Sequence, residues 1–222
     1  MTTTLQTWPH LNTATGGLSK PSKMPCHSWS IPAEECAVGS LLRKIPGSTC
    51  SGCYALKGNY KRYPKVGEAL RRRLEAWRAD RPGWVLAMAG SIRKAGQPFF
   101  RWFDSGDLQG IEMLRDIVEV CRQTPEVSHW LPTRERAVVK EYRAAGGELP
   151  GNLTVRLSAS MVGATLDPST GGPLEGIPVS MVHTDDMAAG AYRCPAPDQK
   201  GKCLDCRACW SRSIPQVSYA AH

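Results

Sequence analysis

From Phe99 onward the chain alternates short apolar segments with helical patterns, and this alternation constrains the fold more than any other feature. Segments rich in aromatic and β-branched side chains are typical of strands; there are four, at residues 99–104, 127–132, 152–158 and 177–182. Helical spacing of apolar side chains marks four more segments, at residues 65–80, 84–95, 108–122 and 134–147. The alternation predicts right-handed βαβ units and an α/β fold built on a parallel sheet.

Polar side chains follow each predicted strand directly. Sites in parallel sheets lie beyond the carboxyl ends of the strands, so these side chains are the candidate site residues. We expect catalytic roles for Asp104, Asp107, Arg134 and His183. Arg134 has the chemistry to grip a carboxylate or phosphate, and Ser158 and Ser160 to bind a ribose hydroxyl.

Simpler roles remain open for each of these side chains. Asp107 suits a tight turn and a helix N-cap, and Arg134 suits an exposed surface. Asp185 or Asp186, which follow His183, suit a helix cap. Small serines after a strand also fit a crowded end of a sheet.

Nine cysteines form two groups along the chain. The number is odd, and the N-terminus lacks the apolar segment of an export signal, so a disulfide scaffold is disfavoured. No run of eighteen apolar residues is present, so we expect no membrane span. In a reducing cytoplasm such thiols serve more often as metal ligands or in catalysis. Cys121, on the apolar face of a predicted helix, is expected only to pack in the core.

The C-terminal group consists of Cys194, Cys203, Cys206 and Cys209. Its order, Cys-x8-Cys-x2-Cys-x2-Cys, contains two consecutive two-residue gaps, as in the compact runs by which ferredoxins hold a 4Fe–4S cluster. Structural zinc more often takes two separated pairs. The spacing therefore favours a 4Fe–4S cluster, with zinc as the alternative metal.

The first group consists of Cys36, Cys50 and Cys53. Three thiolates on a 4Fe–4S cluster leave one iron open to a small molecule, which is the arrangement that cluster chemistry requires. The alternative is a zinc site completed by Cys26 or His27.

The chain carries a formal net charge of +8, and one segment accounts for it. Residues 54–101 contain twelve Lys and Arg against three Asp and Glu, whereas the rest of the chain is close to neutral. The segment 57–81 is therefore a candidate surface for nucleic acid, with a solvated helix face as the alternative.

The length of the chain fits one domain. We expect a flexible arm at residues 1–24, rich in Thr, Ser, Gly and Pro. A single α/β domain then follows at residues 25–222, with a cysteine loop at 26–53 and a C-terminal cysteine segment at 194–210.

Six segments together carry a resemblance to a known family: "HSWSIPAEEC", "CSGCYALKGNY", "FRWFDSGDLQ", "HWLPTRE", "NLTVRLSAS" and "GKCLDCRACW". From Cys26 to Trp210 the chain resembles the phage "gene product 88" family. The resemblance implies a phage origin and, with it, residence in the host cytoplasm.

A more distant similarity concerns the order of a cysteine loop with "CYA", a strand, "LPTRE" and "VRLSAS". This order is similar to radical S-adenosylmethionine enzymes. The similarity implies a partial (β/α) barrel of parallel strands, with a 4Fe–4S cluster held by Cys36, Cys50 and Cys53. The open iron would chelate the amino and carboxylate groups of S-adenosylmethionine, and reductive cleavage would give a 5′-deoxyadenosyl radical.

Two further points follow from that similarity. "DSGD", with Ser105, is the candidate segment for the methionine amino group, and the C-terminal cysteines would hold an auxiliary cluster. The usual spacing is Cys-x3-Cys-x2-Cys, whereas thirteen residues separate Cys36 from Cys50.

The expected function is that of an iron–sulfur protein, of radical S-adenosylmethionine type, with a substrate that the sequence does not identify. Two alternatives stay open: a zinc-stabilised nucleic-acid-binding protein without catalysis, and an iron–sulfur redox protein without radical chemistry.

Overall fold

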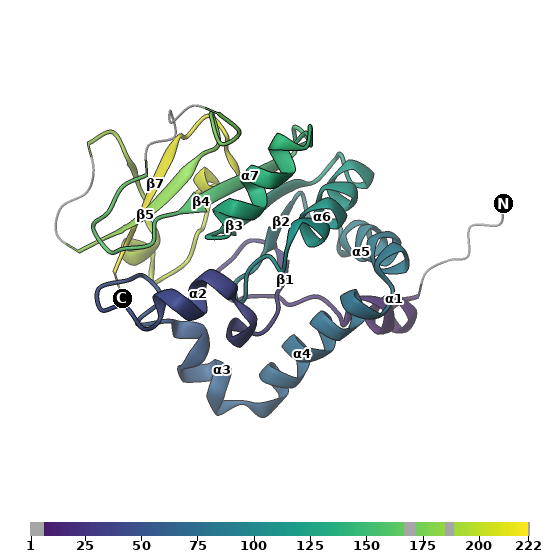
Figure 1. Ribbon diagram of the computed structural model, residues 1–222. Helices are drawn as coiled ribbons and strands as arrows, with labels where there is room; N and C mark the ends of the chain where they lie inside the picture. Colours follow the sequence, from purple (N-terminus) through teal and green to yellow (C-terminus); the bar gives the residue numbers. More distant parts are fainter. Residues whose placement is uncertain (1–6, 167–171, 185–188, 222) are drawn as a thin grey trace.

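Seven parallel strands form one sheet at the centre of the molecule (Figure 1). The computed structural model of the protein describes residues 7–166, 172–184 and 189–221. Neighbouring strands follow the order β1-β2-β3-β4-β5-β7-β6, and every pair runs parallel. The strands are β1 (His27–Trp29), β2 (Phe99–Trp102), β3 (Ser128–Thr133), β4 (Leu153–Ser158), β5 (Val179–His183), β6 (Tyr192–Arg193) and β7 (Gln216–Ala220).

The prediction of an α/β fold with a parallel sheet is confirmed. The four predicted strand segments correspond to β2, β3, β4 and β5, whereas β1, β6 and β7 fall outside them. Strands β1 and β6 are the two edges, and within the described ranges no ladder of hydrogen bonds joins them. The sheet is therefore open and does not close into a barrel.

Seven α-helices and four short 3-10 helices are present in the described ranges. The α-helices are α1 (Trp8–Thr15), α2 (Ala37–Leu42), α3 (Gly58–Arg62), α4 (Pro64–Ala79), α5 (Arg81–Ala95), α6 (Ile111–Gln123) and α7 (Arg136–Ala144). The 3-10 helices are η1 (Ala33–Glu35), η2 (Tyr54–Leu56), η3 (Ala196–Gln199) and η4 (Ala208–Trp210).

Helices α5, α6 and α7 pack against one face of the sheet (Figure 1). Side chains alternate between the two faces of a strand, and Phe100 and Trp102 of β2 point to this side. Trp102 lies in an aromatic cluster with Trp29 and Trp84, whose ring centroids are 5.1 Å apart in an edge-on arrangement. All three tryptophans are fully buried. Burial of this much apolar surface makes the helix-covered face the main core.

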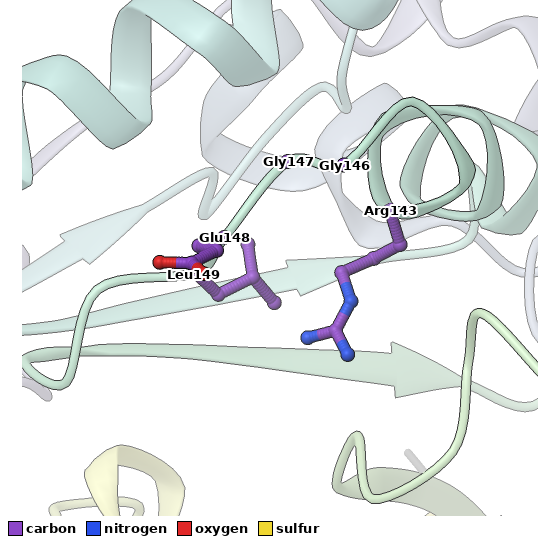
Figure 2. A pocket seen from close by; sticks show the side chains of 5 residues that line it. All are labelled: Arg143, Gly146, Gly147, Glu148 and Leu149. Atoms are coloured by element: carbon purple, nitrogen blue, oxygen red, sulfur yellow. The ribbon is translucent and has the colours of Figure 1, made fainter.

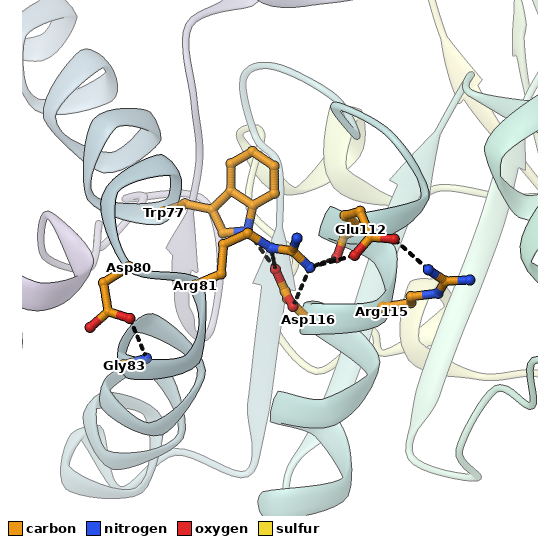
Figure 3. Close-up of polar contacts among 7 residues, drawn as sticks. All are labelled: Trp77, Asp80, Arg81, Gly83, Glu112, Arg115 and Asp116. Carbon is orange, nitrogen blue, oxygen red and sulfur yellow. Dashed lines mark hydrogen bonds and ion pairs between the residues drawn. The ribbon is translucent and has the colours of Figure 1, made fainter.

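An ion-pair cluster joins the ends of α4, α5 and α6 (Figure 3). Arg81 donates from Nε to Asp116 at 2.7 Å and from Nη2 to Glu112 at 2.7 Å. The indole of Trp77 donates to the same Asp116 carboxylate at 2.8 Å. Asp80 ends α4 and caps α5 by accepting from the Gly83 amide at 3.0 Å. These contacts fix the angle between the helices.

The opposite face of the sheet is covered by the chain between β6 and β7. We call it the cysteine face; its side chains include Arg101 of β2, Trp130 of β3, and Thr154 and Arg156 of β4. Thr154 donates to the Trp210 carbonyl at 2.7 Å. Arg156 is fully buried and donates to the carbonyls of Val179, Ala208, Ser211 and Ile214 at 2.9–3.2 Å. The sheet thus holds the C-terminal cysteine segment against itself through its own polar side chains.

Helix α1 lies inside the segment expected to be a flexible arm. Leu11 and Thr15 are fully buried, and the Thr15 carbonyl accepts from the indole of Trp29 at 2.8 Å. Gly16 follows in the left-handed conformation, and a Cβ there would lie 2.5 Å from the backbone of Arg73, so this position requires glycine on both counts. Residues 8–15 therefore form a packed helix and are not part of a flexible arm. The proline and threonine content, on which the prediction of an arm rested, does not prevent this helix.

Candidate metal and cofactor site

The loop after β1 lies across the carboxyl ends of the next strands. The Thr49 amide donates to the Ser160 carbonyl beyond β4 at 2.9 Å. Arg134, beyond β3, donates from Nε to the Thr49 hydroxyl at 3.0 Å. The Glu135 carboxylate accepts from the Val38 amide at 2.9 Å. The ends of β3 and β4 therefore hold the loop that carries Cys36, Cys50 and Cys53, at the edge where parallel sheets place their sites.

Helix α2 brings two of these thiols together. A Cβ on Gly39 would lie 2.9 Å from the Cβ of Cys36, 3.6 Å from its Sγ and 3.8 Å from the Sγ of Cys50. Any side chain at Gly39 would therefore clash with the Cβ of Cys36 and lie in contact with both sulfurs. Cys53 joins them through its amide, which donates to the Cys50 carbonyl at 3.2 Å.

The protein environment disfavours free thiolates in this group. Burial raises the pKa of Cys36 to about 12, and Asp107, Cys53 and Cys50 add to the rise. Burial also raises the pKa of Cys50, against a lowering by Arg134. Deprotonation of these thiols would therefore need a bound cation.

Asp104 lies beside the same loop in a network of hydroxyl donors. Its carboxylate accepts from Ser28 at 3.1 Å, from Tyr60 at 2.8 Å and from Ser30. Burial works to raise the pKa of Asp104, but the charge of Arg101 and these donors hold it below its usual range. Asp104 is therefore an ionised carboxylate at the strand end.

Asp107 ties the ends of β2 and β3 together. Its Oδ1 accepts from the Thr133 hydroxyl at 2.6 Å and the Leu108 amide at 2.8 Å, and its Oδ2 from the Arg134 amide at 2.8 Å. The N-cap role considered for Asp107 is wrong, because α6 has Gly110 at its N-cap. Burial raises the pKa of Asp107 to about 6, against these donors.

The other predicted site residues lie at different distances from the cysteine loop. Ser160 contacts it through its carbonyl, and the buried Ser105 accepts through its carbonyl from the Ile31 amide at 3.2 Å. Ser158 receives a hydrogen bond from Ser180 at 3.2 Å. His183 is buried, with Nδ1 2.5 Å from the Ser218 hydroxyl. Within the described ranges, neither the Ser158 nor the His183 side chain forms a hydrogen bond with the loop. Asp185 and Asp186 lie outside the described residues.

The C-terminal cysteines gather on the cysteine face, and Cys26 gathers with them. Cys26 and Cys209 are buried in one apolar cluster with Trp130 and Trp210, and Cys194 and Cys206 pack against it. The Cys203 amide donates to the Lys23 carbonyl at 3.0 Å, and the Cys203 Sγ lies 3.8 Å from the Met24 sulfur. Cys26 thus belongs with the C-terminal group and not with the first group, and His27 is engaged with Gln97 at 2.6 Å.

Arginines surround these thiols. Burial raises the pKa of Cys26 and of Cys209 to about 12, while Arg101 lowers both values. Arg207 lowers the pKa of Cys26 and Cys203, and Arg156 that of Cys209. None of these three arginines forms an ion pair within 4.0 Å with a carboxylate of the described residues. The local charge therefore suits a group of thiolates.

Neither group is closed around a single ion. Among the residues that the structure describes, no three His, Cys, Asp or Glu side chains are arranged so that they could hold a metal ion. In each cysteine group the thiols lie near one another and near charged side chains.

The family model of Gene product 88 matches residues 2–212, which is nearly the whole chain. The chain belongs to the Gene product 88 family. This confirms the family suggested by the six sequence segments. No curated protein and no solved structure matches the chain.

Three side chains of the candidate site, Arg101, Tyr54 and Tyr60, were not predicted from the sequence. Tyr54 donates to the Asp104 carbonyl, Tyr60 donates to its carboxylate, and the charge of Arg101 acts to lower the pKa of Asp104. The sequence did hold one signal: Arg101 is the only charged residue within the aromatic segment "FFRWF". A charge at that position of a strand must either reach solvent or serve a site.

The basic segment forms α3 and α4 beside the first cysteine group. Arg71 and Arg72 are exposed, but Arg73 is buried and donates to the Gly17 carbonyl at 2.7 Å. Lys61 pairs with Glu34 at 2.5 Å. None of the described helices is long and apolar enough to cross a lipid bilayer.

Two cavities lie away from the cysteines. One, of about 450 Å³, is lined by Arg143, Glu148 and Leu149 with two glycines after α7, at the amino end of β4 (Figure 2). The other, of about 750 Å³, lies between the ends of α4, α5 and α6, around Arg81 and Asp116. Neither is lined by a residue of the candidate site.

Proposed function

We propose that this protein is an iron–sulfur enzyme of radical S-adenosylmethionine type, with its reactive site at the carboxyl edge of the sheet. The observation that carries the proposal is the position of the loop with Cys36, Cys50 and Cys53 across the ends of β2, β3 and β4. That edge is where parallel α/β folds place catalysis. The open seven-stranded sheet suits the partial (β/α) barrel of such enzymes.

The residues present fit a cluster at the first group. Gly39 leaves free the position next to the sulfurs of Cys36 and Cys50, which a larger side chain would fill. The Cys36 thiol, with a pKa of about 12, is protonated at neutral pH, so binding of a metal would release its proton. Such proton release is usual when thiols bind metals. A cluster is larger than a single ion, so gathered thiols that close around no single ion still suit it.

When bound, a cluster with an open iron supplies the coordination of S-adenosylmethionine and the electron for its cleavage. The chain's own residues would position the cofactor. The ionised Asp104 suits an ammonium group, and Arg134 suits a carboxylate. The backbone after β2 with Ser105 and the hydroxyls of Ser158 and Ser160 are the remaining candidates for the nucleoside. Asp107 holds the Arg134 backbone and so acts as a positioning residue.

The C-terminal group would hold a second, fully ligated cluster. Cys194, Cys203, Cys206 and Cys209 are its proposed ligands. The arginines that lie among these thiols without carboxylate partners in the described ranges support an anionic metal–thiolate group. Zinc in the same thiols, without catalysis, remains the competing assignment.

The deciding experiment is metal and sulfide analysis of anaerobically purified protein. We expect iron with matching sulfide, brown colour and little zinc. Replacement of Cys53 by Ser should remove the iron of the first group, whereas Cys121→Ser, in the helix core, should leave the metal content unchanged. Stoichiometric zinc with no iron would reject the proposal.

The radical step needs its own measurement. Reduced protein should convert S-adenosylmethionine to 5′-deoxyadenosine, and the cofactor should change the electron-spin spectrum of the cluster. The Cys53→Ser variant should do neither. A wild-type preparation with iron at the first group that shows neither effect would leave the alternative of a redox protein without radical chemistry.

A further inference from the structure

Arg101 stands in the middle of the cysteine face with much of its hydrogen-bonding capacity unused. Its guanidinium lies over the Trp130 ring, 4.6 Å from the ring centroid, in a cation–π contact. The side chain is half-buried. We propose that Arg101 binds an oxyanion, a carboxylate or phosphate group of the substrate, between the two cysteine groups.

The donor inventory of Arg101 supports this assignment. A guanidinium offers five N–H donors. Nη2 donates to the Phe103 carbonyl at 3.2 Å, and Nη1 donates to the thioether of Met24 at 3.7 Å, a weak acceptor. Nε is buried and has no hydrogen-bond partner among the described residues. One hydrogen on each η nitrogen is left, which is the fork that a planar oxyanion accepts.

Arg101 also has no direct ion pair in the described part of the chain. No carboxylate of the described residues lies within 4.0 Å of it. The charge of Asp104 acts on Arg101 only from beyond that distance, and its carboxylate already accepts from Ser28, Ser30 and Tyr60. A half-buried cation without a direct ion-pair partner is costly, and a bound anion reduces that cost.

The location of Arg101 between the two cysteine groups indicates that the bound oxyanion belongs to the substrate. On the cysteine face, the charge of Arg101 acts on the thiols of Cys26, Cys203 and Cys209. Toward the carboxyl end it faces Asp104 and Tyr54, and Tyr54 directly follows Cys53. The Tyr54 side chain is 55% exposed, so this end is open to solvent. A molecule held by Arg101 would therefore lie beside the first cysteine group.

The thiols themselves are the competing partner for Arg101. Arg207 and Arg156 already supply positive charge to the same group: Arg207 next to Cys203, and Arg156 next to Cys209. Arg156 is held by four carbonyls and cannot turn away. Arg101 alone of the three also faces Asp104.

The test is calorimetric titration of anaerobically purified protein with sodium phosphate and, separately, with sodium acetate at constant ionic strength. Arg101→Gln removes the charge and the fork, and Arg101→Lys keeps the charge alone. The matched control is Arg122→Gln, an exposed arginine of α6. We expect the wild type and the control to bind one oxyanion equally, Arg101→Gln to bind it at least about tenfold more weakly, and Arg101→Lys to lie between. The better-bound salt identifies carboxylate or phosphate.

Each other outcome overturns the assignment. Equal binding by wild type and Arg101→Gln, or no binding of either salt by the wild type, removes the oxyanion site. Loss of metal from both Arg101 variants, with full metal in the control, assigns Arg101 to the thiolates instead. The assignment of the bound oxyanion to a substrate rests on the proposed function. Wild-type protein without iron that still binds phosphate through Arg101 would refute the enzyme proposal and leave the oxyanion site standing.

Discussion

Replacement of Arg156 by Met tests whether the sheet itself holds the C-terminal cysteine segment. Arg156 is fully buried, and its two η nitrogens donate to four carbonyls, three of them on the segment between β6 and β7. Methionine fills a similar volume and donates nothing. The change leaves four buried carbonyls without their donor, although it also removes the cost of burying the charge.

The expected loss of unfolding free energy is about 4 kcal/mol, because four buried carbonyls lose their donor at about 1–3 kcal/mol each and removal of the buried charge offsets part of that cost. For a chain of this length, that corresponds to a fall in Tm of about 8–16 °C. The loss should be present in metal-free protein, because the acceptors are carbonyls and not metal ligands.

Thermal unfolding followed by circular dichroism measures the effect, on chelated and on metal-loaded protein. The matched control is Arg122→Met, which removes an exposed ion pair with Glu119 and should cost less than about 1 kcal/mol. An Arg156→Met protein that unfolds within about 2 °C of wild type would show that the four contacts contribute little, and the reasoning would fail.

Three further outcomes are expected. Burial lowers the pKa of His129 to about 3, below its ordinary value near 6.5, so the unfolded chain takes up the proton first. Stability should therefore fall by about 1.4 kcal/mol per pH unit as pH drops from about 6.5 toward 3, and urea titrations of His129→Gln should show a flatter slope. Gly106→Ala should cost about 3 kcal/mol in denaturant unfolding, because a Cβ there, at φ 83°, would lie 2.7 Å from a backbone oxygen. Gly146→Ala, at φ 79° in open space, isolates the strain and should cost about 1–2 kcal/mol; equal losses in the two variants would exclude the clash. If the basic segment binds nucleic acid, Arg71→Gln with Arg72→Gln should weaken binding of a labelled oligonucleotide at about 50 mM salt and flatten the salt slope, whereas no wild-type binding would favour a solvated face.

The sequence predicted the parts of the fold that local periodicity encodes. Helix α6 and strands β2 to β5 are long enough to show their repeat within one window. Strands β1 and β6 have three and two residues, and their pairing partners lie far along the chain or in an unpredicted strand. No local pattern can encode such pairings.

The candidate site was predictable only in part for a related reason. Cys26 is close to Cys36 in sequence, but β1 lies between them and directs the two thiols to opposite ends of the strand. Asp107 precedes the helical pattern, but α6 begins only at Ile111, which frees Asp107 to receive donors from the next strand end. In both cases the contacts of the residue are set by how distant segments pair in the fold, and not by its neighbours along the chain.

The connection between β6 and β7 has a consequence for handling the protein. Parallel neighbours usually need a crossover through an α-helix, but the described structure places only η3 and η4 in this connection, together with the four C-terminal cysteines. Strand β6 has two exposed residues and, among the strands of the described ranges, pairs only with β7. If oxidation of the thiols loosened this crossover, β6 would detach and leave β7 as a bare edge with its backbone donors and acceptors open. Such an edge is a template for intermolecular strand pairing, so exposure to air would promote aggregation before it unfolds the helix-covered core.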